Sequence, residues 1–147
     1  MVRSAFAGLA LALVATGAAW AAWPFARAES TPAPTQALAF PGAQGWAAAT
    51  PGGRGGRIIR VTTLAAEGPG SFREAAEAKG PRIIVFEVGG VVDLEGKTLT
   101  IREPFLTIAG QTAPSPGVTF IKGGLDIATH DVIVRHIRVR PGEAGFP

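Results

Sequence analysis

The sequence DVIVRHIRVRPG, residues 131–142, decides how the fold is interpreted. It is a β-branched run, typical of strands, that is interrupted at His136 and ended by a Pro-Gly pair. A hairpin strand would be followed by a tight return turn and an antiparallel partner, and neither follows here. Upstream, the chain instead repeats short apolar runs punctuated by glycine: IIVFEVGG, FLTIAGQT and VTFIKGG. The run is therefore one of a series.

The spacing of these runs indicates a solenoid. Apolar residues recur about 20 to 22 positions apart: Ile84 with Leu106, Phe86 with Ile108, and Ile101 with Ile121. Periods of this size are typical of solenoid proteins. The runs are too short and too β-branched for helical repeats, and they lack a leucine-rich repeat pattern. We therefore predict an all-β fold, a parallel β-helix with stacked aliphatic residues inside, and an antiparallel β-sandwich is the main alternative.

The first 28 residues have the features of a secretory signal peptide. Arg3 supplies a positive start, and Ala5–Ala22 is free of charge and rich in alanine and leucine. We expect cleavage after Ala28, a linker at residues 29–37, and a folded domain at residues 38–147. The cleaved chain would be secreted, extracellular or periplasmic, and free of the membrane. The alternative is an uncleaved membrane anchor, because the uncharged stretch is nearly long enough to span a bilayer.

The charge and cysteine content narrow the function. The formal net charge of +3 includes Arg3 and Arg27, and without them 12 basic residues face 11 acidic ones. No basic helix or clustered Lys/Arg run is present, so a nucleic-acid partner is not expected. The chain has no cysteine, which excludes a disulfide framework, a cysteine nucleophile and a cysteine metal site.

The clearest local signal is GPGSFRE, residues 68–74. Ser71 as N-cap and Glu74 three residues later make a capping box. We predict a short α-helix over residues 71–79, stopped by a Gly-Pro pair, that covers the first coil as a terminal cap. Outside the coils, we interpret Trp46 as an apolar plug at the end of the solenoid rather than as a ligand-stacking residue.

Six motifs, taken in order, resemble the N-terminal part of secreted pectate lyases. They are AFPGAQGW, TPGGRGGRIIRVTTL, GPGSFREA, GPRIIVFEVGGVVDL, LTIAGQTAPSPGV and VIVRHIRVRPG. These polysaccharide lyases share a right-handed parallel β-helix, so the resemblance implies that handedness over residues 38–142. The chain departs from the family in having no asparagine, which excludes the stacked asparagine ladder at the turns. His136 occupies a turn position where such a residue is expected.

The resemblance implies cleavage of polygalacturonate, or pectate, by Ca²⁺-dependent β-elimination with an arginine as base. Calcium bridging the carboxylates of enzyme and substrate would acidify the abstracted proton. In the family, the calcium-binding aspartates and the catalytic arginine come from coils that follow the strand resembling VIVRHIRVRPG. We therefore assign no catalytic residue and no calcium ligand, and we expect them beyond Pro147. A complete protein of this kind is expected to be a monomer.

Arg138 and Arg140 are the candidate substrate-binding residues. Strand alternation places them on one side and Ile133, Ile137 and Val139 on the other. Arginine side chains bind carboxylates in a bidentate manner, which suits the row of uronates in an acidic polysaccharide. The competing interpretation, that both arginines are simply solvated strand charges, stays open.

The remaining acidic and histidine residues are assigned no metal. Asp126 and Asp131 flank predicted turns, and turn formation explains both better than a calcium site does. His130 and His136 lie on one strand-turn segment without a third ligand nearby, so a zinc site is not supported.

We expect the chain to be incomplete, because it has an N-terminal cap and about three to four coils but no C-terminal cap. Two hypotheses follow. The first is part of a secreted, Ca²⁺-dependent pectate lyase that lacks the catalytic coils. The second is a non-catalytic β-helix module that binds acidic polysaccharide or a protein partner. The sequence leaves open whether the chain is an enzyme on its own.

Overall fold

The computed structural model describes residues 37–142. The predicted signal peptide and nearly all of the predicted linker lie outside these residues. None of the helices in the described part of the chain is long and apolar enough to cross a membrane. The elements are β1 (Arg57–Val61), α1 (Phe72–Glu77), β2 (Arg82–Phe86), β3 (Gly90–Asp93), β4 (Leu99–Ile101), β5 (Leu106–Ala109), η1 (Gly110–Thr112), β6 (Val118–Ile121), β7 (Leu125–Ile127), β8 (Val132–Arg135) and β9 (Ile137–Arg140).

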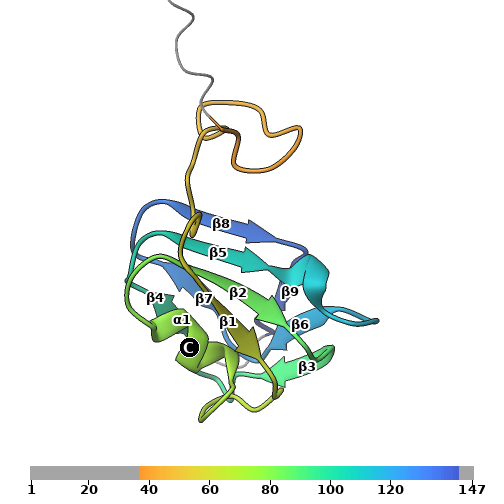
Figure 1. Ribbon diagram of the computed structural model, residues 1–147. Helices are drawn as coiled ribbons and strands as arrows, with labels where there is room; N and C mark the ends of the chain where they lie inside the picture. The colour runs from red at the N-terminus through yellow and green to blue at the C-terminus, as the bar shows by residue number, and fades with distance from the viewer. Residues whose placement is uncertain (1–36, 143–147) are drawn as a thin grey trace, which may run out of the picture. The chain divides into compact units, whose positions relative to one another are not determined.

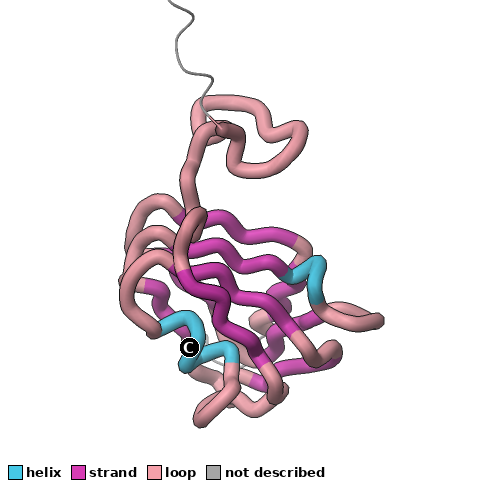
Figure 2. The backbone as a smooth tube through the Cα atoms, viewed as in Figure 1, coloured by secondary structure: helices cyan, strands magenta, loops and turns pink. Residues whose placement is uncertain are grey.

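The strands form three parallel sheets that wind around one interior (Figures 1 and 2). Sheet A has the order β1-β2-β5-β8, sheet B has the order β3-β6-β9, and sheet C pairs β4 with β7. Every strand pair is parallel, and each strand lies beside its counterpart from the next coil. The predicted parallel β-helix is therefore confirmed, and the antiparallel sandwich is excluded for this part of the chain.

The register of sheet A differs from the predicted one by two residues. Ile84 pairs with Ile108, and Leu106 pairs with Arg82 rather than with Ile84. A shift of two residues keeps every side chain on the same face of the sheet, so the sequence pattern could not distinguish the two registers. The turns between sheets also vary in length, which prevents a constant period. Ile101 therefore pairs with Ile127 in sheet C, whereas we predicted Ile121.

The interior is filled by stacked aliphatic residues and a small aromatic cluster. Phe72 of α1 stacks on Phe86 with 5.8 Å between ring centroids, and lies 4.5 Å from Phe120 in sheet B. These rings join the helix to sheets A and B, and burying each of them stabilises the fold by about 1.5–3 kcal/mol. The most deeply buried apolar side chains are Val61, Phe72, Ile84, Val92, Leu94, Leu99, Ile101, Leu106, Ile108, Val118 and Phe120.

Helix α1 lies at the β1 end of the solenoid, as the predicted cap (Figure 1). The Ser71 hydroxyl accepts a hydrogen bond from the Glu74 amide at 3.3 Å, which confirms the N-cap. The Glu74 carboxylate accepts from the Gly70 amide at 2.7 Å, one residue earlier than in the usual capping box. The helix ends at Glu77, before the predicted Lys79, because Ala78 is already extended.

Arg82 explains why the helix ends there. Its side chain is fully buried although it carries a charge, and it points from β2 toward the last turn of α1. The guanidinium donates from Nε to the Ala75 carbonyl at 3.3 Å and from Nη2 to the Ala76 carbonyl at 2.6 Å. It also donates to the carbonyls of Gly80, Glu103 and Pro104. Arg82 therefore caps the helix C-terminus with a side chain and ties it to the next coil.

The glycine cluster at residues 52–56 forms the turn into β1, and it also covers part of sheet A. The Gly53 amide donates to the Thr107 hydroxyl at 2.9 Å, across the outer face of β5. A side chain at Gly52 would collide with Ile133 of β8, and one at Gly53 would collide with the Arg82 carbonyl. Glycine is needed at position 53 because its backbone lies directly against that of Arg82, and at position 52 because its φ is 53° and the Ile133 side chain leaves no room for a Cβ.

Trp46 does not behave as predicted. Its side chain is completely exposed, so within the described residues it plugs no part of the solenoid. The turn that carries it, residues 37–50, projects beyond β8 in Figure 1. Its shape is set by hydrogen bonds from Ala39 to Ala48 at 2.8 Å and from Ala43 to Phe40 at 3.1 Å.

Candidate functional site

The outer face of sheet B carries both predicted site residues. In β9, Ile137 and Val139 pair with Val118 and Phe120, whose side chains are at most 1% exposed. Arg138 therefore points outward, and so does Arg140. The predicted separation of these arginines from Ile137 and Val139 is confirmed.

The same prediction was wrong for Ile133. His136 has a φ of 55° and turns the chain from β8 in sheet A into β9 in sheet B. The strand alternation consequently restarts after His136. Val132 and Val134 pair with the buried Leu106 and Ile108, so Ile133 points outward and is buried under residues 52–53 instead. The prediction of a turn at His136 is confirmed.

Arg138 and Arg140 line an open groove of about 380 Å³ on this face. The groove is bounded by the outward side chains of three neighbouring strands, and Val91 on β3 is 53% exposed there. Arg138 is partly fixed, because its Nη1 donates to the Pro116 carbonyl at 3.1 Å. The residues that line the groove are Gly90, Val91, Pro116, Thr119, Ile121, Arg138 and Arg140.

The groove is positively charged. Its lining contains two arginines and no carboxylate, and in the described part of the chain neither arginine forms an ion pair. Asp93, at the end of β3, is paired with Lys122 through a 2.6 Å contact. That hydrogen bond holds the pKa of Asp93 below its ordinary value and raises the pKa of Lys122. Asp93 is thus ionised and paired with Lys122 rather than with either arginine of the groove.

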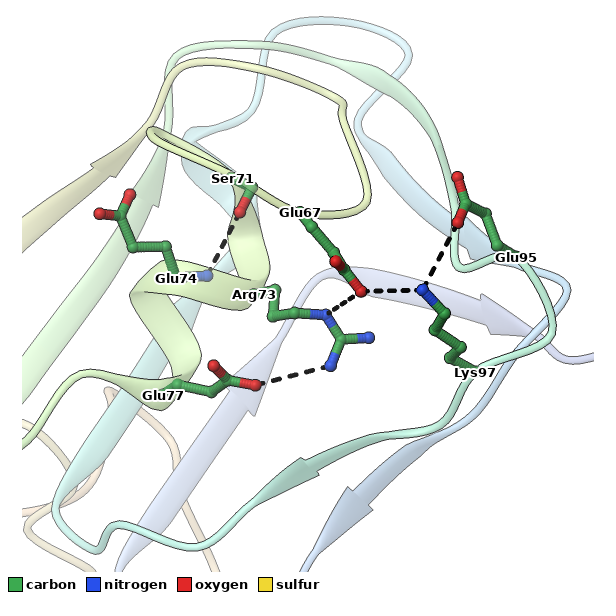
Figure 3. Close-up of polar contacts among 7 residues, drawn as sticks. All are labelled: Glu67, Ser71, Arg73, Glu74, Glu77, Glu95 and Lys97. Atoms are coloured by element: carbon green, nitrogen blue, oxygen red, sulfur yellow. Dashed lines mark hydrogen bonds and ion pairs between the residues drawn. The ribbon is translucent and has the colours of Figure 1, made fainter.

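A second charged cluster lies beside α1 and connects the helix to the turns around it (Figure 3). The Glu67 carboxylate accepts a hydrogen bond from Lys97 at 3.0 Å and lies 3.6 Å from the Nε atom of Arg73. The Nη1 atom of Arg73 lies 3.5 Å from the Glu77 carboxylate. The hydrogen bond from Lys97 lowers the pKa of Glu67. These pairs link the turn before the helix to the turn before β4. Glu77 is an exposed ion-pair partner of Arg73.

The histidine and aspartate residues to which the sequence analysis assigned no metal lie in turns and in strand β7. His130 Nδ1 lies 2.8 Å from the Asp131 carboxylate, and Asp131 has a φ of 56° at the turn before β8. Asp126 lies within β7 rather than beside a turn, so its predicted turn role was wrong. No group of three or more His, Cys, Asp or Glu side chains that could hold a metal ion occurs among residues 37–142. These residues therefore do not fit a calcium ion.

A parallel β-helix with a basic groove on one sheet is the class of protein that this geometry defines. The chain is similar to the probable pectate lyase C of Emericella nidulans, with 46% identity over 112 residues, or 76% of this chain and 26% of that protein. The Aspergillus terreus protein of that name is 44% identical over 109 residues, covering 74% of this chain and 25% of the relative. The Aspergillus fumigatus protein of that name is 43% identical over 112 residues, which are 76% of this chain and 26% of the relative.

The part of the chain that matches is thus related to pectate lyases, as its motifs predict. The chain spans about a quarter of the length of the curated relatives it matches. No protein-family profile matches it.

Proposed function

We propose that this chain is a scaffold and binding segment of a secreted pectate-lyase-like protein. Its role is to hold polygalacturonate against the groove on sheet B. Within that protein, Ca²⁺-dependent β-elimination is carried out by residues other than 37–142. The observation that carries the proposal is the identity of 43–46% to probable pectate lyases over a β-helix that has a cationic open face.

The chemistry of the groove supports an acidic polysaccharide. A polyuronate presents one carboxylate per sugar unit in a row, and guanidinium groups bind carboxylates through parallel hydrogen bonds. Arg138 and Arg140 project from alternate positions of one strand, about 6.5–7 Å apart along the chain. Thr119 and the exposed Val91 beside them offer a hydroxyl group and an apolar surface to the sugar rings. A neutral polysaccharide would leave both guanidinium groups without counterions.

The test is retardation of the full chain in a native gel containing polygalacturonate, with neutral galactan as the reference polymer. We expect the wild type to be retarded only by polygalacturonate. Arg138→Ala combined with Arg140→Ala should abolish most of the retardation. Arg102→Ala removes an exposed arginine outside the groove, so it is the matched control and should leave the retardation largely unchanged. Equal retardation of the double variant and the wild type would remove the groove from the binding site.

The second candidate is a non-catalytic module that binds acidic polysaccharide without belonging to a lyase. The basic groove supports it as well, because Arg138 and Arg140 can bind carboxylates without a metal ion. The two candidates differ in the products. A lyase, once its β-helix is complete, releases unsaturated uronates that absorb in the ultraviolet, and a binding module retains polygalacturonate intact in every form.

A further inference from the structure

The groove on sheet B divides into two rows of side chains, one for each arginine. In the register of the sheet, Val91 of β3 lies beside Thr119 of β6, and Thr119 lies beside Arg138 of β9. All three residues line the groove. Because neighbouring strands lie about 4.7–4.9 Å apart, the row spans about 9–10 Å. It presents an apolar surface, a hydroxyl group and a guanidinium group in succession. We call Val91, Thr119 and Arg138 the Arg138 row.

The row of Arg140 has a different chemistry. Arg140 lies beside Ile121 of β6, and Ile121 lies beside Asp93 of β3. This row has no hydroxyl group, and it ends in a carboxylate that is already paired with Lys122. Arg140 is therefore the only donor side chain in its row, and the two arginines of the groove are not equivalent.

The Arg138 guanidinium is oriented by the loop between η1 and β6. Its Nη1 atom donates to the Pro116 carbonyl at 3.1 Å. The loop is itself held in place, because the Gly117 amide donates to the Pro114 carbonyl at 2.7 Å and the Gly90 amide donates to the Gly117 carbonyl at 2.8 Å. One end of the guanidinium is therefore tied to a fixed point of the backbone.

The contact with Pro116 leaves one edge of the guanidinium for a ligand. A guanidinium group has five N–H donors, and it binds a carboxylate through two parallel hydrogen bonds. Among residues 37–142, the Nε and Nη2 atoms of Arg138 donate to no protein acceptor, whereas Nη1 does. These two atoms form an edge that matches a carboxylate while Nη1 stays bonded to the loop.

We propose that the Arg138 row is a subsite for one uronate unit, and that Arg140 adds only charge attraction. The uronate carboxylate accepts hydrogen bonds from Nε and Nη2 of Arg138. A hydroxyl group of the sugar bonds to the Thr119 hydroxyl, and carbons of the ring lie on Val91. Thr119 is thus a specificity-determining residue that the sequence analysis did not single out. The inference rests on the proposed function, which it narrows from the whole groove to one row.

Lysine substitutions separate the roles of the two arginines. The measured quantity is the dissociation constant of the full chain for polygalacturonate, obtained from its retardation at increasing polymer concentration. Arg138→Lys keeps the charge but loses the forked pair of donors, so it should raise the dissociation constant by about tenfold or more. Arg140→Lys keeps an exposed charge and should raise it by less than about threefold. Equal effects of the two substitutions would overturn the subsite, while the double alanine variant would still show whether the groove binds.

A valine substitution tests the hydroxyl group of Thr119. Thr119→Val keeps the shape of the side chain and should raise the dissociation constant by about three- to tenfold, the effect of one lost hydrogen bond. Thr100→Val is the matched control, because Thr100 is a half-buried threonine at an outward position of β4 in sheet C. It should leave the dissociation constant unchanged. The subsite would be overturned if the two variants bound polygalacturonate equally well.

The orientation of Arg138 has a readout that needs no polysaccharide. In protein labelled with ¹⁵N-arginine, we expect the Arg138 guanidinium to rotate more slowly about its Nε–Cζ bond than that of Arg102, the exposed control. The Arg138 signals are assigned by their absence in Arg138→Lys. Equally fast rotation of both groups would overturn the fixed guanidinium even if polygalacturonate binds. A wild type that polygalacturonate does not retard would instead refute the proposed function, and with it the ligand of this subsite, whatever the Arg138 signals show.

Discussion

Arg82 is the residue on which the end of the solenoid most depends. Arg82→Met keeps the aliphatic stem and volume but removes the donors to five carbonyl oxygens. The two carbonyls in fully buried positions, those of Ala75 and Ala76, would cost about 1–3 kcal/mol each when left without donors. Part of this is offset because the buried guanidinium, whose desolvation lowers its pKa, no longer has to be accommodated. We expect a net loss of about 3 kcal/mol.

Urea unfolding followed by circular dichroism measures this loss. The free energy of unfolding of Arg82→Lys should lie between those of Arg82→Met and the wild type. The lysine ammonium group still has three donors, but it lacks the planar, forked guanidinium that reaches both α1 and the turn before β5. Arg60→Met is the control. Arg60 is an exposed arginine on β1 paired with Glu87, and its loss should cost less than about 1 kcal/mol. An Arg82→Met variant as stable as this control would refute the capping role of the guanidinium.

Three further predictions concern stability. Gly53→Ala should lower the free energy of unfolding by about 1–3 kcal/mol, because the added Cβ would overlap the Arg82 carbonyl. An unchanged melting temperature would show that this contact is absent. Phe72→Ala should cost about 3–5 kcal/mol by emptying the aromatic cluster, whereas a cost below about 1 kcal/mol would show that α1 is not packed on the coils. Lys122→Ala should destabilise slightly at neutral pH but not in acid. Because the pKa of Asp93 is lowered in the folded state, the Asp93–Lys122 pair stabilises the fold above pH 3.8, the ordinary pKa of the carboxyl group. This stabilisation is lost as the pH falls through the folded-state pKa. An equal loss of stability in Lys122→Ala at pH 2 and at pH 7 would contradict this.

The sequence was sufficient for the architecture because the strands alternate and recur. The alternation of Arg82, Ile84 and Phe86 shows which face of β2 is buried, and the capping box locates the helix to within one residue at its start. The capping motif is local, so it does not depend on the rest of the fold. The register between coils could not be obtained in this way, because shifts of two residues preserve the pattern.

The residues that the sequence analysis misjudged or did not single out depend on the three-dimensional path of the chain. Arg82 carries no local mark of burial, and its only clue is that it occupies an inward position in β2. Ile133 changes face because the single residue His136 turns the chain between sheets. Trp46 was expected to cover the solenoid, but its segment passes the last described strand. Strand alternation was enough for Arg138 and Arg140, since both follow His136 in one strand.

Residues 37–142 form part of a parallel β-helix that is similar to probable pectate lyases, and the proposed function places β-elimination in residues other than these. The most direct test is the ultraviolet absorbance of polygalacturonate incubated with Ca²⁺, for the full chain alone and for the chain joined to the remaining part of the Emericella nidulans relative. We expect no unsaturated product from the folded chain alone, and we expect the joined protein to release unsaturated product until Ca²⁺ is chelated. Release by the chain alone, or a folded joined protein that releases nothing, would contradict this expectation.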